Sequence, residues 1–287
     1  MIWKNFMINN SIIIRFKFRK KEIMKMEYLK CLTQLSNITT NTGEIVEVFE
    51  LADDIDTSSF DEWAKHFRQQ YCPDDAFDTM VRGTGLTKEQ FLIQRKFPDE
   101  TDDFGPGTRS GDFGELLVSD YLEFILGYSV PRDKYKIKFN RNTSMQGTDV
   151  IAYKIQGTKY SPQDELLTFE VKTQASKGTS ENRLQDAIND SKKDEPIRKG
   201  ETLSALKQLY FDKNELKKVM EIERFQNKPD NPYREIYGAA AVYDAAFYSP
   251  NDIKAVNLYG LKRRLIVIKR NSLMKLIHEL YKRAAQC

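Results

Sequence analysis

The sequence predicts a mixed α/β (α+β) domain in which helices flank a central mixed β-sheet. The first observation behind this is the order of patterns: an apolar helix near residue 115, three strands, then a further helix and strand. The second is the length of 287 residues, which suits one large domain or two small ones. The third is the composition, since 40% of the residues are apolar and 30% are charged, as in ordinary globular proteins.

The composition also excludes several classes of site. The chain has only two histidines and three cysteines, and no Cys-x-x-Cys pair, which excludes zinc ribbons and thioredoxin-type sites. An odd number of separated thiols fits a reducing cytoplasm, and no apolar run approaches the roughly 20 residues of a membrane span. We therefore expect a cytoplasmic protein, without membrane contact, whose chemistry uses carboxylates, lysines or hydroxyls.

Residues 1–30 form a basic leader. It holds eight basic and two acidic residues, a net charge of +6, so the rest of the chain carries −3 of the total of +3. Two interpretations stay open. The leader is a nucleic-acid-binding arm or a disordered segment, or it is an over-extended start, because Met24 and Met26 could each begin the protein.

Residues 31–105 form an acidic, mixed N-terminal region that either packs on the core or docks a partner. Apolar residues recur there at helical spacing and predict a packing helix that Ser58 or Ser59 could cap. These residues are Phe60, Trp63, Ala64 and Phe67. A turn-rich segment at 104–107 sets a soft boundary, and residues 106–287 are expected to form the main domain.

The helix after this boundary runs to about Leu126. Ser110 or Asp112 could cap its start and Gly127 could end it. It is apolar nearly all round, which predicts burial on most sides, and Glu115 is expected in its first turn.

Alternating or apolar runs then predict the sheet. Strands are expected at 135–139, 150–153, 166–172, 236–247 and 265–268. Helical patterns between and after these strands complete the layers. They cover residues 181–193, 201–226 and 271–284.

Three carboxylates and a lysine form the most informative constellation. Side chains alternate along a strand, so Glu170 and Lys172 share one face while Phe169 packs on the other. Asp149 begins the preceding strand, and Glu115 lies upstream in the buried helix.

Converging carboxylates repel one another unless a cation lies among them. Hard oxygen ligands favour Mg²⁺ or Mn²⁺, and such an ion can polarise a phosphoryl oxygen and acidify an attacking water. A neighbouring lysine can orient that water or stabilise the developing charge. The constellation therefore predicts phosphodiester hydrolysis, although Glu-x-Lys on its own is more often a solvated ion pair.

The order of these motifs resembles the PD-(D/E)XK nuclease superfamily: Glu115, then Gly-Thr-Asp at 147–149, then Glu-Val-Lys at 170–172. The segment Arg-Ser-Gly-Asp-Phe-Gly-Glu at 109–115 further resembles the HamA family, nuclease subunits of the Hachiman anti-phage defence system. Likeness extends over roughly residues 105–280. The resemblance implies a restriction-endonuclease-like core with an N-terminal extension.

The resemblance also implies roles. Asp149 and Glu170 would be metal ligands for Mg²⁺ or Mn²⁺, Lys172 the catalytic lysine, and Glu115 the helix carboxylate that completes the site. Thr148 stands where the superfamily motif has proline. The implied function is a metal-dependent deoxyribonuclease, held in check and activated by a HamB-like superfamily 2 helicase with which it would form a heterodimer on DNA.

Other residues are weaker candidates for nucleic-acid contact. Arg109, Lys138 and Arg141 could grip phosphates near the site, although surface lysines and arginines mostly serve as solvated charges. Gln185, on the helix after the catalytic strand, could face the site or the helix surface.

Two alternatives to the defence nuclease stay open. The chain could be a catalytically silent interaction subunit of a helicase complex, whose acidic cluster is an ion-pair network. It could also be a PD-(D/E)XK nuclease of a restriction or mobile-element system, with the same chemistry and another partner.

Overall fold

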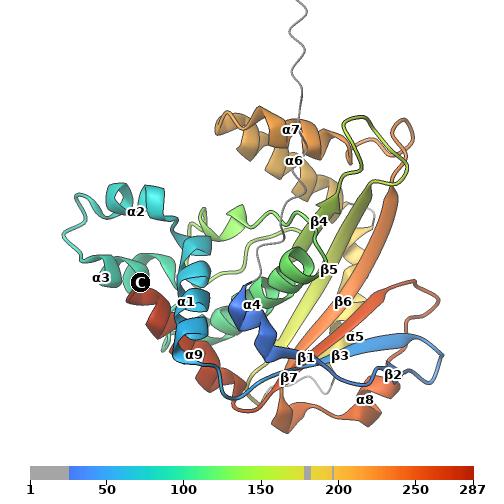
Figure 1. Cartoon of the computed structure of the whole chain (residues 1–287), viewed down its shortest axis with the longest axis horizontal. Helices are drawn as coiled ribbons and strands as arrows, with labels where there is room; N and C mark the ends of the chain where they lie inside the picture. Colours follow the sequence, from blue (N-terminus) through green and yellow to red (C-terminus); the bar gives the residue numbers. More distant parts are fainter. Residues whose placement is uncertain (1–25, 178–181, 196) are drawn as a thin grey trace, which may run out of the picture.

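A single mixed sheet runs through the molecule. The computed structural model describes residues 26–177, 182–195 and 197–287, and its strands follow the order β1-β3-β7-β6-β5-β4, with β2 paired to β3 (Figure 1). The strand bounds are β1 (Leu32–Gln34), β2 (Ile38–Thr39), β3 (Ile45–Leu51), β4 (Val150–Lys154), β5 (Glu165–Gln174), β6 (Arg234–Asp244) and β7 (Arg264–Arg270). The predicted fold class, a mixed sheet flanked by helices, is confirmed.

The four central strands are parallel and the outer ones antiparallel. β3, β7, β6 and β5 run in the same direction, whereas β1 and β4 pair antiparallel with their neighbours. Parallel strands need both faces covered, and β7 and β6 are accordingly buried and apolar on both sides, whereas β5 carries polar residues on one face. β3 pairs with β7, so the N-terminal region contributes to the same sheet as the residues after 105.

Helices cover both faces of this sheet. Figure 1 looks onto the face that α4 crosses, with α1 and α9 beside it. Leu184 and Ile188 of α5 pack on the other face, in a second cluster with Ala239 and Ala241 of β6. The helix bounds are α1 (Thr57–Tyr71), α2 (Asp74–Val81), α3 (Lys88–Phe91), α4 (Gly105–Asp120), α5 (Arg183–Asp190), α6 (Arg198–Asp212), α7 (Leu216–Glu223), α8 (Pro250–Lys254) and α9 (Leu273–Ala285). None of the helices in the described parts of the chain has the length and apolarity of a membrane span.

The apolar stripe of α1 packs in the core, as predicted, but its cap differs. Trp63, Ala64 and Phe67 are buried. The cap is Asp56, whose carboxylate accepts a hydrogen bond from the Ser59 backbone N–H, so the prediction of Ser58 or Ser59 was wrong by two or three residues. An aspartate one turn before the apolar stripe satisfies the first free N–H groups equally well.

The helix that carries Glu115 begins earlier than predicted. α4 starts at Gly105 with Pro106 in its first turn, so the turn-rich segment 104–107 is largely helical. Proline suits this position because the first N–H groups of a helix lack internal partners in any case. Asp112 therefore lies inside α4 rather than at its cap, and Glu115 lies in its second half. A π-helical turn at Tyr121–Ile125 continues α4, and Gly127, with φ of +73°, follows its end as predicted.

The strand predicted at 135–139 does not form. A short 3-10 helix covers Asp133–Tyr135, and the following residues are irregular. Tyr135 is buried as predicted, but beyond it Ile137 and Phe139 are exposed, while the side chain of Lys138 is only 4% exposed. Lys138 lies inside because it pairs with the buried carboxylate of Asp112, and a buried charge needs a partner.

The long helix predicted over 201–226 is two helices. α6 ends at Asp212 and α7 begins at Leu216, with Asn214 between them at a φ of +57°. Asparagine tolerates this left-handed conformation, which breaks the helical run without glycine or proline. Part of the helix predicted at 181–193 forms as α5 and a following 3-10 turn, and residue 181 lies outside the described residues.

Candidate active site

The strand β5 carries two charged residues into the sheet centre. Glu170 and Lys172 lie beside Ala239 and Ala241 of β6, on the face that α5 covers. Phe169 and Val171 point to the other face and pack in the core under α4. The alternation predicted for this strand is confirmed.

Asp149 is brought opposite Glu170 by strand register. Val150 of β4 pairs antiparallel with Phe169, so the residue before Val150 aligns with Glu170. One carboxylate oxygen of Asp149 accepts a hydrogen bond from the Val171 backbone N–H at 2.9 Å. Gly147 has a φ of +116°, a conformation that favours glycine and turns the chain into this strand.

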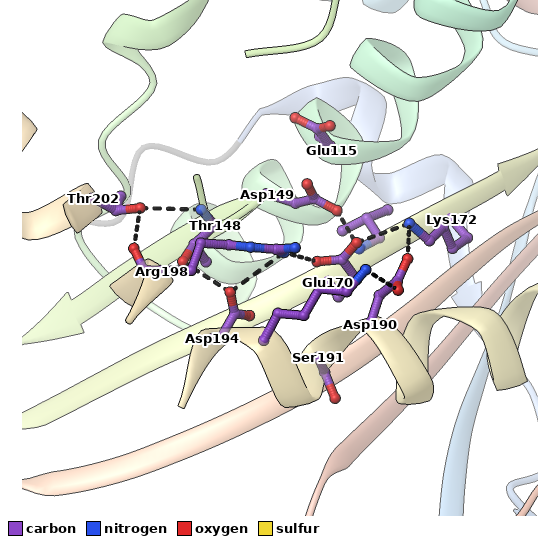
Figure 2. A network of polar contacts seen from close by, with 12 residues as sticks. Glu115, Thr148, Asp149, Glu170, Lys172, Asp190, Ser191, Asp194, Arg198 and Thr202 are labelled. Atoms are coloured by element: carbon purple, nitrogen blue, oxygen red, sulfur yellow. Dashed lines mark hydrogen bonds and ion pairs between the residues drawn. The ribbon is translucent and has the colours of Figure 1, made fainter. Parts of the chain in front are cut away.

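Glu115 approaches the same place from the opposite side of the sheet. It projects from α4, whereas Glu170 belongs to the face under α5, and Figure 2 shows Asp149 between the two. Glu115 can approach Asp149 past the edge of the sheet, because β4 is the edge strand and Asp149 precedes its first residue. Glu115 is itself paired, since its Oε2 contacts the Lys134 ammonium at 2.5 Å and accepts a hydrogen bond from the Tyr135 hydroxyl at 2.8 Å.

The charges at the site are unevenly balanced. Burial, and then the charges of Glu115 and Glu170, hold the pKa of Asp149 well above its ordinary value. Glu170 is only 3% exposed and is bonded by two cations, Lys172 at 2.8 Å and Arg198 at 2.7 Å. The site thus disfavours the charged form of Asp149, first because the carboxylate is buried and then because two further carboxylates are near it.

Lys172 is held between two carboxylates. Its Nζ lies 2.8 Å from Glu170 Oε1 and 2.8 Å from Asp190 Oδ2, at the end of α5. Burial alone would lower the pKa of Lys172, but the bonds to Asp190 and Glu170 raise it above the ordinary value. Lys172 is therefore a protonated ammonium at neutral pH in this structure.

These residues line a pocket of about 480 Å³. Asp149, Glu170 and Lys172 form one wall, and the chain from Asp190 into the first turn of α6 forms another. The second wall contributes Asp190, Lys193, Ile197, Arg198 and Glu201. Nothing in the sequence singles out Asp190 and Arg198 beyond a highly charged run at 190–201, which is typical of any solvated segment.

The donor chemistry fits a hard divalent cation in part. Asp149 and Glu170 are adjacent carboxylates, and oxygen ligands of this kind suit Mg²⁺ or Mn²⁺. After burial, the negative charges of Glu115 and Glu170 raise the pKa of Asp149, and a cation would offset those charges. Within residues 26–177, 182–195 and 197–287, however, no group of three His, Cys, Asp or Glu side chains is arranged to hold a metal ion. The physical reason is that Glu115 and Glu170 each turn toward basic side chains.

The residues predicted to grip phosphates have internal partners. Arg109 is buried and donates to the Pro98 carbonyl, Lys138 pairs with Asp112, and Arg141 donates to carbonyls of the 93–97 segment. Gln185 bonds the backbone of Asn257. None of the four is among the side chains that line the pocket, and their contact with nucleic acid stays a prediction.

A family comparison covers almost the whole chain. The HamA family model matches residues 26–284 of the 287. The chain belongs to the HamA family. It is therefore a subunit of the Hachiman anti-phage defence system. The HamA match takes in the N-terminal strands β1–β3 as well as the pocket residues. No curated protein matches the chain.

Proposed function

We propose that this HamA-family chain is a metal-dependent deoxyribonuclease of the PD-(D/E)XK type, the effector of its defence system. One observation carries the proposal. Asp149 and Glu170 lie opposite each other on adjacent strands, and Lys172 lies beside Glu170 on the same face, in one open pocket. Two carboxylates for a metal ion and a neighbouring lysine are a residue set suited to metal-assisted phosphodiester hydrolysis.

Asp149 and Glu170 are the residues that would hold Mg²⁺ or Mn²⁺, with Glu115 close enough to add negative charge at Asp149. The bound ion would polarise a phosphoryl oxygen and lower the pKa of a water. Lys172, held protonated by Asp190 and Glu170, would orient that water or stabilise the charge that develops on the phosphate. Its raised pKa favours this electrostatic role over proton abstraction.

A helicase partner of the HamB type is part of the proposal. Membership of a multi-subunit defence system supports a partner. Charge supports it too, because the chain outside residues 1–30 has a net charge of −3, whereas duplex binding by a lone protein usually relies on many basic contacts to phosphate. A subunit that delivers DNA would make up this deficit.

Plasmid cleavage tests the proposal. The chain alone, and the chain with its helicase partner and ATP, are incubated with supercoiled plasmid in Mg²⁺ or in EDTA. We expect Mg²⁺-dependent cleavage that falls by at least 10³-fold in Glu170→Gln and Lys172→Ala, because each removes a group that acts on the transferring phosphate. Cleavage only with helicase and ATP would support gated activation.

A matched control is Glu165→Gln, which changes the same residue type on the same strand, outside the pocket. It is expected to keep full activity. Cleavage that survives Glu170→Gln and Lys172→Ala would contradict the assignment of the site.

One observation favours a second candidate, the silent interaction subunit. Glu170 is neutralised by Lys172 and Arg198, which is also what a purely structural ion-pair network would look like. In that case the plasmid stays intact under all conditions while the chain still binds its helicase, and Glu170→Gln lowers the stability of the fold.

A further inference from the structure

Arg198 extends across the pocket from the first turn of α6. Its Nη1 lies 2.7 Å from Glu170 Oε2 and 3.6 Å from Asp194 Oδ1, so the guanidinium is placed between two carboxylates (Figure 2). The side chain is 22% exposed and lines the pocket beside Asp149 and Glu170. Arg198 is thus anchored on the protein side and open on the pocket side.

The anchor itself is buried and fixed. Asp194 is fully buried, and its Oδ1 accepts a hydrogen bond from the Thr148 hydroxyl at 3.1 Å. Thr148 in turn precedes Asp149, and its backbone N–H donates to the Thr202 hydroxyl of α6. Asp194 Oδ2 has no hydrogen-bond partner among the described residues. The contact with Asp194 Oδ1, together with the bond to Glu170, positions Arg198 at the edge of the site.

Arg198 also has donors to spare. Both carboxylate contacts use one nitrogen, Nη1, of a planar group with five N–H donors. Lys172 is likewise shared by two carboxylates, and Lys193 pairs with Asp190 at 2.6 Å, but neither ammonium has a second nitrogen to offer. Of these pocket cations, Arg198 has the geometry that matches a phosphate, because the guanidinium fork binds two phosphate oxygens at once.

The start of α6 lies at the same pocket. α6 has 15 residues, its N-cap Ile197 makes no side-chain capping bond, and Ile197, Arg198 and Glu201 all line the pocket. The positive end of a helix dipole favours an anion nearby.

We propose that Arg198, backed by the first turn of α6, forms a phosphate-binding subsite that holds the nucleic-acid backbone against Asp149 and Glu170. The inference deepens the proposed function and rests on it for the identity of the ligand as DNA. Arg198 would leave Glu170 for the phosphate when a metal ion takes over neutralisation of that carboxylate.

The test measures DNA binding separately from cleavage. Fluorescein-labelled single-stranded and duplex DNA are titrated with the full chain in EDTA and in Ca²⁺, and binding is followed by anisotropy across a range of salt concentrations. The variants are Arg198→Gln and Arg198→Lys. Arg234→Gln is the matched control, because Arg234 is an exposed arginine paired with Glu165, outside the pocket.

We expect Arg198→Gln to bind at least about tenfold more weakly, as for loss of a charge-assisted bond, with a duplex salt slope that is smaller by about 1. Arg198→Lys keeps the charge and loses the fork, so its salt slope is retained and its affinity is intermediate. Arg234→Gln should bind as the wild type does. In cleavage, KM should rise in Arg198→Gln by more than kcat falls.

Unchanged DNA affinity and salt slope in Arg198→Gln, with an unchanged thermal midpoint, would overturn the subsite. A wild-type chain that binds DNA neither in EDTA nor in Ca²⁺ would also overturn it. If Arg198→Gln does not fold, wild-type affinity of Arg198→Lys overturns it instead. DNA binding that depends on Arg198, without any cleavage in Mg²⁺, would support the subsite and refute the nuclease. Cleavage with a normal KM in Arg198→Gln would support the nuclease and refute the subsite.

Discussion

Asp190 shows how one residue outside the sequence motif shapes the chemistry inside it. It shares the ammonium of Lys172 with Glu170 and lies on α5. We expect Asp190→Asn to lower kcat about 10- to 100-fold with little change in KM, as for other residues that support a catalytic group. The alkaline limit of activity should also move to lower pH, because Lys172 loses a partner that raises its pKa.

Steady-state cleavage over a range of pH measures both effects. Asp186→Asn, on the same helix and outside the pocket lining, is the control and should leave the pH profile in place. A normal profile in Asp190→Asn would show that Glu170 alone positions Lys172.

Asp112 makes stability depend on pH. Burial raises its pKa to about 6, although Lys138 opposes the shift, whereas an unfolded aspartate titrates near pH 3.9. Between these values the folded state keeps a proton that the unfolded state releases, so stability falls as pH rises from about 4 to about 6 and is constant above that.

The size of this fall is about 2–3 kcal/mol, from the difference of roughly two pKa units. Urea unfolding of wild type and Asp112→Asn at several pH values measures it. The difference in free energy of unfolding between the two proteins should change through this window and level off above pH 6. A constant difference would show that Asp112 titrates normally.

At the scale of elements, the contact between α4 and β5 sets the site. Gly114 of α4 lies so close to β5 that an added Cβ would be 2.1 Å from Thr173 Oγ1, whereas a Cβ at Gly111 would meet nothing within 4 Å. We expect Gly114→Ala to cost about 1–3 kcal/mol of stability by overpacking. Gly111→Ala, in the same helix, should be neutral or stabilise by up to about 1 kcal/mol.

Chemical denaturation of both variants checks this, and plasmid cleavage extends it. Gly114 precedes Glu115, so displacement of α4 should also reduce activity in Gly114→Ala. Equal stability of the two variants would mean that the Thr173 side chain can move aside, and that the close packing of Gly114 against β5 is not required.

For the whole molecule, the sheet joins both halves of the chain. β3 lies between β1 and β7. A fragment of residues 106–287 would therefore expose the edge of β7 that pairs with β3, and it would lack α1, which packs in the core. We expect this fragment to show no cooperative thermal unfolding, in contrast to the full chain. Calorimetry decides the point, and a fragment with the same midpoint as the full chain would show that residues 106–287 fold alone.

The fold class and the motif strand could be predicted because local patterns specify them. A strand with alternating side chains must place Glu170 and Lys172 on one face and Phe169 on the other, and this holds in the structure. The helical stripe around Trp63 is likewise a local signal. The expected strand at 135–139 failed because a non-local ion pair, Lys138 with Asp112, decided which side chains are buried.

The order Glu115, Asp149, Glu170, Lys172 and the resemblance to HamA can be found without a structure, and these residue types already indicate chemistry at phosphate. Which groups surround them depends on the folded structure. Asp190 and Arg198 reach the pocket, while Arg109, Lys138 and Arg141 turn inward. The physical reason is that a charged residue finds its partner through the packing of distant segments, and neither spacing nor periodicity along the chain encodes that distance.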